Sequence, residues 1–307
     1  MGAPLIWDKD PILWTIPWVN WPIRYYGLFF ALAFLLGFQL FRWQIARAQG
    51  SEDEAVSFIL PGFLGVLLGA RLGHILFYNL DRFLQEPLWF FRFWEGGLAS
   101  HGAAVGLVAA LLFQAWRRKR PFWDLADRFS FAAATGAALV RVGNFFNSEI
   151  VGRVAPPDFP FSVAFPRHDF LPPGLAPPRY PTQIAESLLG FFVLGALFLA
   201  DRLAGREKRP RGLLAALFLV LYFAGRFFIE FWKERQNEWD ILYFSRGQLL
   251  SIAPFLLGIA LLIWIACRSK KGIAREPHPP RASRAALSKP QGRRGQKRAR
   301  RGRQRRR

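Results

Sequence analysis

Three polar side chains recur at four-residue intervals in the apolar segment 212–232. Tyr222, Arg226 and Glu230 therefore share one face of a helix. A charged side chain in hydrocarbon costs at least about 2.5–3.5 kcal/mol on insertion scales, so it needs a partner or a task. Two interpretations remain open. One is a buried ion pair that joins helices, and the other is an anion site in which Glu230 holds Arg226 against a phosphate, whose oxygens match the planar guanidinium.

A second group of polar residues closes the apolar segment 126–146 and continues beyond it. Arg141 and Asn144 lie three residues apart on one helical face, which Asn147 extends. Glycine within the stretch permits a close approach or a turn. This polar density exceeds what a span needs for packing, so the stretch predicts a site. The candidate residues are Arg141, Asn144, Asn147, Glu149, Gly152 and Arg153.

His101 begins the apolar segment 97–116 and is surrounded by glycines. A single histidine in an apolar helix is most often a structural residue. Here its expected depth is the same as that of Arg141 and Glu230, which favours a place in the same site.

The remaining histidines give no sign of a metal site. His74, His168 and His278 are scattered along the chain, and no set of histidines has the spacing of metal ligands. Cys267 is the single cysteine, so a cysteine metal cluster and an internal disulfide are both excluded. We expect no metal and no cofactor.

These residues lie in a chain whose composition is typical of a membrane protein. Hydrophobic residues form 52% of its 307 positions, and charges lie mostly between the apolar runs. A bilayer core needs roughly 20 apolar residues per helix. The sequence therefore predicts an all-α integral membrane protein with seven transmembrane helices. Their expected ranges are about 24–42, 56–79, 97–116, 126–146, 182–201, 212–232 and 247–267.

Basic residues follow alternate spans. Arg42 and Arg47 follow the first span, the run 117–120 follows the third and the stretch 202–211 follows the fifth. A basic tail follows the seventh. Because positively charged loops stay in the cytoplasm, this pattern predicts an external N-terminus and a cytoplasmic C-terminus.

Three further regions adjoin or interrupt the predicted membrane domain, 24–267. Residues 1–23 contain four tryptophans and several prolines, which predicts an arm at the membrane interface and no cleavable signal peptide. The stretch 147–181 is rich in proline and predicts an irregular cap on the outer face. Residues 268–307 hold 17 Lys or Arg and one acidic residue, so we expect a disordered tail.

The basic tail contributes +16 of the net charge of +21. Anionic lipid head groups are its expected partners, at about 1 kcal/mol per basic residue near the surface. RNA or ribosome contact is the alternative, because basic tracts attract polyanions in general. The rest of the chain is only weakly basic, so no specific nucleic acid is expected.

Six motifs occur along residues 20–265 in the order found in prolipoprotein diacylglyceryl transferases. The sequence Gly-Asn144-Phe-x-Asn147-x-Glu149-x-x-Gly152-Arg153, which follows Arg141, resembles the signature of that family. The other five motifs are Arg-Tyr-Tyr26-Gly, Gly-Ala-Arg71-Leu-Gly, Gly-Gly-Leu-Ala-Ser-His101-Gly, Gly-Arg226-Phe-Phe-Ile-Glu230-Phe and Gly-Gln-Leu-Leu-Ser251.

The resemblance implies an enzyme that moves the sn-1,2-diacylglyceryl group of phosphatidylglycerol onto the lipobox cysteine of a preprolipoprotein, with release of glycerol phosphate. It also implies a bacterial inner-membrane protein of seven spans whose site faces the periplasm. The thiol must lose its proton to attack, and cations must hold the charge of the leaving phosphate.

The resemblance also assigns roles to residues of this chain. His101 is the candidate base, with a carboxylate as the alternative. Arg141 and Arg226 would bind the lipid phosphate, and Glu230 would fix Arg226. The residues expected to bind or orient the substrate are Tyr26, Asn144, Asn147, Glu149, Gly152, Arg153 and Tyr222.

The chain departs from the family at one motif. The family's His-Pro-Ser/Thr-Gln-Leu-Tyr-Glu reads Tyr180-Pro-Thr-Gln183-Ile-Ala-Glu186 here, so the glutamine and the glutamate are kept while the histidine and tyrosine are not. Arg246 also stands where the family commonly has an apolar residue. These differences concern the entry to the site more than its phosphate-binding part.

Two other classes of protein carry charges within a membrane. A transporter would show paired inverted halves or broken helices in matching positions, and the sequence has neither. A non-catalytic scaffold that binds lipid would need the arginines but not His101.

Overall fold

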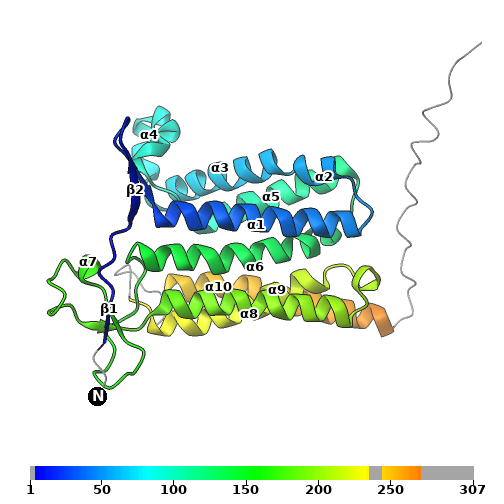
Figure 1. The fold of residues 1–307 in the computed structure, drawn as a ribbon. Helices are drawn as coiled ribbons and strands as arrows, with labels where there is room; N and C mark the ends of the chain where they lie inside the picture. Colours follow the sequence, from blue (N-terminus) through cyan, green and yellow to red (C-terminus); the bar gives the residue numbers. More distant parts are fainter. Residues whose placement is uncertain (1–3, 235–243, 271–307) are drawn as a thin grey trace, which may run out of the picture. The chain divides into compact units, whose positions relative to one another are not determined.

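The computed structural model describes residues 4–234 and 244–270 of the chain, and most of them are helical (Figure 1). Seven helices of this part have 17 residues or more and lie side by side. They are α1 (Tyr25–Arg47), α3 (Ile59–Tyr78), α5 (Ser100–Arg118), α6 (Phe122–Phe146), α8 (Thr182–Leu203), α9 (Leu213–Ile229) and α10 (Arg246–Lys270).

Six helices of the described residues are long and apolar enough to cross a membrane. They span Tyr25–Arg47, Glu52–Tyr78, Phe122–Phe146, Thr182–Leu203, Leu213–Trp232 and Arg246–Arg268. The segment 97–116, predicted as a further span, forms α5, but this helix is not among the six. The polar side chains of Ser100, His101 and Gln114 reduce its apolar character.

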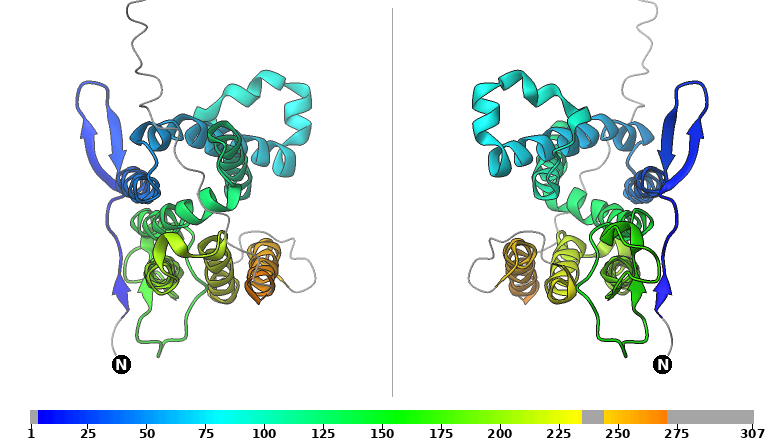
Figure 2. Two further views of the ribbon diagram at one scale, coloured as in Figure 1. Left: turned by 90° about the vertical axis from the view of Figure 1, so that its right-hand side faces the viewer. Right: turned by 90° about the vertical axis from the view of Figure 1, so that its left-hand side faces the viewer.

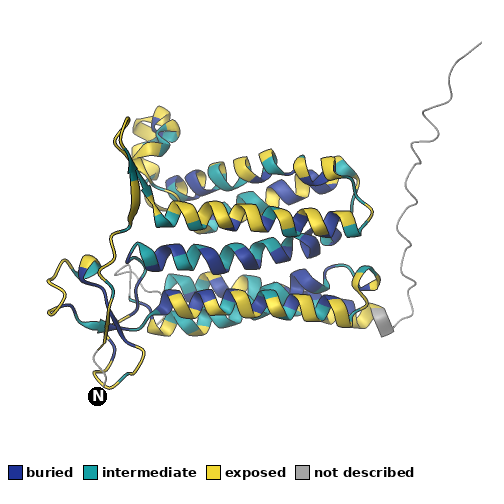
Figure 3. Ribbon diagram, in the orientation of Figure 1, coloured by how far each residue is buried: buried dark blue, intermediate teal, exposed yellow. Residues whose placement is uncertain are grey.

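The long helices other than α6 bury only a minority of their side chains, and large apolar residues cover the outside of the bundle (Figure 3). In water such a surface would be unstable, whereas in lipid it has the right solvent. Among the six candidate spans, α6 is the most deeply buried. It packs against α1, α8 and α9 (Figure 2) and so forms the centre of the bundle.

Helices α3 and α5 contact each other through glycines, as the four-residue spacing of Gly65, Gly69 and Gly73 predicts. A Cβ atom added at Gly106 would overlap the carbonyl group of Gly65, and one added at Gly102 would overlap that of Gly69. The two backbones are therefore in direct contact.

Short strands and turns gather at one end of the bundle, which we call the cap end (Figure 1). Strand β1 pairs in parallel with β4, β4 pairs antiparallel with β5, and β2 and β3 form a hairpin. The bounds are β1 (Leu5–Ile6), β2 (Ile12–Ile16), β3 (Trp21–Arg24), β4 (Val163–Ala164), α7 (Pro166–Asp169) and β5 (Pro178–Arg179). The arm predicted at 1–23 thus contains strands where it is described.

The link between α3 and α5 folds around a buried arginine. The guanidinium of Arg71, which is fully buried, donates hydrogen bonds to the carbonyl oxygens of Trp89 (2.6 Å), Phe90 (3.0 Å) and Gly96 (2.5 Å). Its carbon Cζ lies 4.3 Å from the centre of the Trp89 ring. Arg71 therefore braces this link, which contains α4 (Leu80–Gln85), η1 (Pro87–Phe91) and η2 (Phe93–Glu95).

At the opposite end of the bundle, which we call the far end, buried ion pairs join several helices. Arg128 of α6 contacts Glu207 at 2.7 Å, and Asp201 of α8 contacts both Arg47 and Arg209 at 2.7 Å. The far end also holds α2 (Glu52–Val56) and η3 (Arg206–Lys208).

The carboxylate of Asp127 accepts hydrogen bonds from the backbone N–H groups of Gly212 (2.8 Å) and Ala215 (2.9 Å). It thereby caps the first turn of α9 from a neighbouring helix. Most of the predicted basic tail, 271–307, lies outside the described residues. Helix α10 continues to Lys270, three residues beyond the predicted end of the last span.

Candidate active site

A buried carboxylate at the cap end is surrounded by three cations. Glu186 of α8 is 1% exposed. Its oxygen Oε2 lies 3.0 Å from Nε of Arg141, and its Oε1 lies 3.1 Å from Nζ of Lys233 and 3.6 Å from Nη1 of Arg226. We call these four residues and Glu230 the Glu186 cluster. Its members come from α6, α8, α9 and the turn that follows α9.

Two glycines allow the helices to bring these side chains together. A Cβ atom at Gly190 of α8 would lie 2.6 Å from the backbone nitrogen of Ala138 on α6, so the two helices touch one turn from Glu186 and Arg141. A Cβ atom at Gly225 of α9 would overlap the side chain of Leu189 on α8. Both contacts are possible only because these positions lack a side chain.

Lys233 reaches the cluster because the chain after η4 (Glu230–Trp232) pairs with the segment 151–153. The N–H of Arg153 donates to the carbonyl oxygen of Trp232 at 2.9 Å, and Gly152 forms a bridge with Lys233. A Cβ atom at Gly152 would overlap the carbonyl of Tyr180, which explains the glycine at this position.

The amine of Lys233 is buried and lies between two acids, Glu186 and Glu230. Burial lowers the pKa of Lys233 below its ordinary value, while the charge of Glu186 acts in the opposite direction. A lysine in this position adds positive charge to the site, and the neighbouring carboxylates favour its protonated form.

A chain of hydrogen bonds extends from the cluster along the predicted signature. Nη1 of Arg141 donates to Oδ1 of Asn144 at 3.2 Å, and Nδ2 of Asn144 donates to Oε1 of Glu149 at 2.8 Å. Asn147 donates to the same carboxylate oxygen at 3.3 Å. Two amides thus orient the carboxylate of Glu149, and Oδ1 of Asn147 is a buried acceptor without a partner among the described residues.

Tyr26 of α1 packs against this segment at Gly143, where an added Cβ atom would lie 3.0 Å from the tyrosine ring. The structure therefore places Tyr26 beside the residue that precedes Asn144. The side chain of Arg153 is exposed, and this residue contributes to the site through its backbone.

The expected pairing of Glu230 with Arg226 does not appear as an ion pair within 4 Å among the described residues, although the charge of Glu230 acts on Arg226. Arg226 has Glu186 as its acid, and Glu230 lies 3.4 Å from Lys233 and against Gly247 of α10. Helix α9 ends at Ile229 and the chain then tightens into η4, so the regular four-residue spacing stops before Glu230. Tyr222 stacks on Phe218, with ring centres 5.4 Å apart.

His101 lies at a groove rather than among the charges of the Glu186 cluster. Its ring packs edge-on against Phe77, with centres 4.8 Å apart, and its Nε2 is buried without a hydrogen-bond partner among the described residues. The groove has a volume of about 1140 Å³ and is lined mainly by apolar residues of α3 and α5, with Leu250 of α10. An apolar wall with one imidazole is suited to lipid chains near a proton acceptor.

Two residues of the site were missed by the sequence interpretation. Glu186 was noted as part of a motif and given no role, because its two partner arginines lie 45 and 40 residues away in the chain. Lys233 lies just beyond an apolar segment, where a lysine is ordinary. Its seven-residue spacing from Arg226 was no guide, because α9 ends at Ile229 and Lys233 reaches the cluster through its pairing with the segment 151–153.

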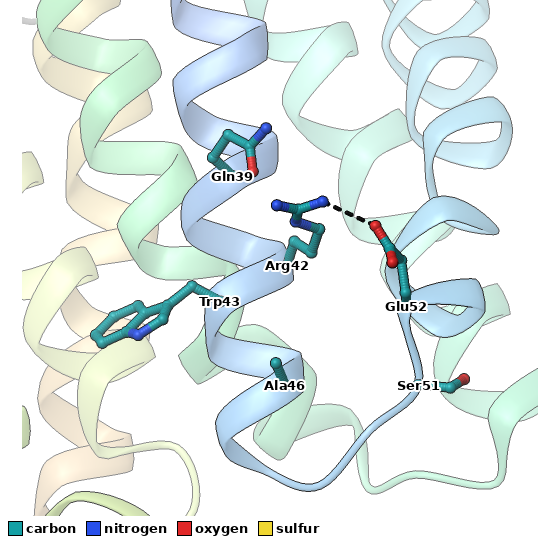
Figure 4. A pocket seen from close by; sticks show the side chains of 6 residues that line it. All are labelled: Gln39, Arg42, Trp43, Ala46, Ser51 and Glu52. Carbon is teal, nitrogen blue, oxygen red and sulfur yellow. Dashed lines mark hydrogen bonds and ion pairs between the residues drawn. The ribbon is translucent and has the colours of Figure 1, made fainter.

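A separate cavity of about 420 Å³ lies toward the far end, between α1 and the start of α2 (Figure 4). Its walls include Trp43 and an exposed ion pair between Arg42 and Glu52 at 2.8 Å. None of its lining residues belongs to the Glu186 cluster. Among the residues that the structure describes, no group of three His, Cys, Asp or Glu could hold a metal ion.

The family model described as prolipoprotein diacylglyceryl transferase matches residues 11–264 of the chain. The relatives described next all carry the name phosphatidylglycerol–prolipoprotein diacylglyceryl transferase. That of Actinobacillus pleuropneumoniae serotype 3 (strain JL03) is 36% identical over 267 residues, which cover 85% of this chain and 96% of the relative.

The relative from Pasteurella multocida (strain Pm70) is 38% identical over 264 residues, covering 83% of this chain and 91% of the relative. The relative from Chloroherpeton thalassium (strain ATCC 35110 / GB-78) is 38% identical over 262 residues, covering 84% and 93%. The matched residues include the whole Glu186 cluster and the segment from Arg141 to Arg153. The chain therefore belongs to the prolipoprotein diacylglyceryl transferase family.

Proposed function

We propose that this protein transfers the diacylglyceryl group of phosphatidylglycerol to the cysteine thiol of a prolipoprotein, the first step of lipoprotein maturation. The names of its relatives give the two substrates. The observation that carries the proposal is the meeting of Arg141, Arg226 and Lys233 around Glu186. Three cations in a membrane bundle are suited to an anionic group that belongs to a lipid.

The reaction requires a new carbon–sulfur bond and the loss of a carbon–oxygen bond. The thiol gives up its proton, and the sulfur attacks the glyceryl carbon that bears the phosphate ester. The electron pair of the broken carbon–oxygen bond stays on the phosphate oxygen, so that glycerol phosphate leaves. Arg141 and Arg226 would hold the phosphate while this charge develops.

His101 is the proposed acceptor of the thiol proton, with Glu149 as the carboxylate alternative. His101 lines the apolar groove, where acyl chains would lie, and its Nε2 has no hydrogen-bond partner among the described residues. Asn144, Asn147 and Tyr26 would orient the head group through the hydrogen-bonded segment around Glu149. The lipobox around the substrate cysteine would bind at the same end of the bundle.

The sequence supports the proposed placement in the membrane. The six apolar helices make this a multi-pass membrane protein, and we propose α5 as a seventh span within a bacterial inner membrane. The basic loops favour an external N-terminus, so that the cap end, with residues 147–181, faces the periplasm. Residues 1–23 would lie at the interface, and the basic tail would contact anionic lipid head groups in the cytoplasm.

Membership of an enzyme family favours catalysis over the transporter and scaffold alternatives. The decisive test is transfer by the purified full-length chain, with phosphatidylglycerol and a synthetic lipobox peptide. We expect the peptide to gain the mass of one diacylglyceryl unit while glycerol phosphate appears. Arg141→Ala should abolish both signals, and Arg42→Ala, at an exposed far-end site, should preserve them.

The variant His101→Ala distinguishes an enzyme that uses His101 as its base from a non-catalytic scaffold that binds lipid. A loss of turnover of roughly 10²–10⁴-fold is expected for removal of a general base. A rate close to that of the unaltered protein would remove His101 from the chemistry. No transfer by folded, unaltered protein would reject the proposed function itself.

A further inference from the structure

The Glu186 cluster has an unusual balance of charge for a site that binds an anion. Arg141, Arg226 and Lys233 supply three positive charges, and Glu186 and Glu230 supply two negative ones. One net positive charge remains among these five residues, and Glu149, the next acid, reaches Arg141 only through Asn144. Because Glu186 contacts all three cations, its negative charge lowers the affinity of the site for any anion.

The substrate and product of the proposed reaction differ in charge. The phosphodiester of the donor lipid carries a single negative charge, whereas the phosphate monoester that leaves has a second pKa near 6 and is close to doubly charged at neutral pH. Three uncompensated cations in a buried site would bind the dianion more tightly than the lipid. Product release would then limit turnover.

We infer that Glu186 is a positioning residue that also matches the charge of the site to the monoanionic lipid, so that the dianionic product is released. This inference rests on the proposed function. Glu186 fixes Arg141 and Arg226 at the spacing of its two oxygens, since one oxygen contacts each arginine. Lys233 balances its charge from the remaining side.

The geometry explains how the carboxylate of Glu186 can both position the arginines and set the charge of the site. Glu186 is almost completely buried, so water does not screen its charge. It lies on α8, whereas the cations come from α6, from α9 and from the residue after η4. A single acid thus controls the position of side chains from three separate parts of the chain.

The test is inhibition of transfer by added glycerol phosphate, measured for Glu186→Gln. Removing one negative charge leaves the cluster with two net positive charges. The inhibition constant of glycerol phosphate should fall about tenfold, because one unscreened charge acts on the dianion at short range. Turnover should also fall, and by a larger factor than the change in KM for phosphatidylglycerol. An unchanged inhibition constant would overturn the inference.

Two further variants protect the test against a merely structural effect. Glu186→Gln combined with Lys233→Met restores one net positive charge, and its inhibition constant should return toward that of the unaltered protein. Lys233→Met alone removes one positive charge from the cluster. The inhibition constant of glycerol phosphate should therefore rise about tenfold. Equal inhibition in Lys233→Met and the unaltered protein would contradict the charge balance, even if Glu186→Gln does not fold.

The controls separate this inference from the proposed function. Glu186→Asp keeps the charge and should retain ordinary product inhibition, whereas Glu52→Gln removes an exposed acid of α2 and should change nothing. The unaltered protein must release glycerol phosphate in the same assay. If it does not, the proposed function fails. In that case, direct binding of glycerol phosphate to the unaltered protein and to Glu186→Gln still tests the role of Glu186.

Discussion

Arg141 and Arg226 can remain charged within an apolar bundle because Glu186 lies between them. Removing one partner of such a buried pair leaves an uncompensated charge and is strongly destabilising, by about 3–5 kcal/mol in other proteins. The cluster avoids this penalty by sharing one carboxylate among three cations, with Glu230 as the second acid of Lys233. The side chains of Arg141 and Arg226 nevertheless remain 14% and 20% exposed.

The shape of the guanidinium should matter as much as its charge. We expect Arg226→Lys to lower transfer by roughly 10–100-fold, because a lysine cannot donate two parallel hydrogen bonds and a bond to a charged group is worth about 1.5–3 kcal/mol. The measurement is the initial rate of peptide modification. Arg42→Lys at the far end is the matched control, and an active Arg226→Lys would show that charge alone suffices.

The arginines of the site were predictable from sequence, and their partner was not. Arg141 and Arg226 stand out because a charge within an apolar run is rare. Glu186 could not be assigned to them, since that pairing depends on which helices touch. Glu230 makes its nearest ion pair with Lys233 rather than with Arg226, because a periodicity argument holds only while the helix continues, and α9 ends at Ile229.

Among the elements, the contact between α3 and α5 depends most visibly on single residues. The two helices form most of the groove beside His101, and they meet through facing glycines rather than through interlocking side chains. In lipid, where the hydrophobic effect does not drive helices together, such close packing has to supply the attraction.

Gly106→Ala should destabilise the protein by about 1–3 kcal/mol, the usual cost of forcing extra atoms into a packed contact. The added methyl group would overlap the carbonyl of Gly65. Gly136→Ala, on α6, is the matched control because a Cβ atom there meets nothing within 4 Å. Thermal unfolding in detergent should show a lower midpoint for Gly106→Ala and an unchanged midpoint for Gly136→Ala. Equal midpoints in the two variants would mean that α5 can move away from α3 at little cost in free energy.

The far end depends on charge, and therefore on pH. Burial acts to raise the pKa of Glu207, but the hydrogen bond and charge of Arg128 outweigh it and hold that pKa below the ordinary value of 4.5. A carboxyl group whose pKa is lowered by folding stabilises the protein above that ordinary value, and the contribution is lost as the pH falls through the lowered value.

Unfolding midpoints measured at pH 7 and at pH 3 should therefore differ less in Glu207→Gln than in the unaltered protein. The variant should also be less stable at pH 7, because Arg128 and Arg47 lose a charged partner. Glu52→Gln removes an exposed acid and should leave the pH dependence as it was. The same pH dependence in Glu207→Gln would assign acid sensitivity to other carboxylates.

At the scale of the whole chain, the hydrophobic runs were sufficient to predict the helices. Six of the seven expected spans correspond to helices long and apolar enough to cross a membrane. The strands of the N-terminal arm could not be predicted in the same way. They are short, and β1 pairs with β4 from a distant part of the sequence, so no local pattern specifies β1.

The match to the family ends at residue 264, and α10 ends at Lys270. A chain truncated after Lys270 should therefore keep most of its transfer activity in a reconstituted assay, although it loses most of the basic tail. The comparison requires equal amounts of inserted protein. A large loss of activity in correctly inserted protein would assign the tail a part in catalysis, and a loss only in anionic vesicles would assign it to lipid binding.

Helix α6 carries a charged layer at each of its ends. Arg128 belongs to the far-end ion pairs and Arg141 to the Glu186 cluster, and 13 residues separate them. At 1.5 Å per residue the two layers are about 20 Å apart, whereas the hydrocarbon core of a bilayer is about 30 Å thick. Both layers cannot reach the head groups of an undeformed membrane. At least one layer therefore lies below the head groups of the surrounding membrane, where its charges depend on the partners that the bundle itself supplies.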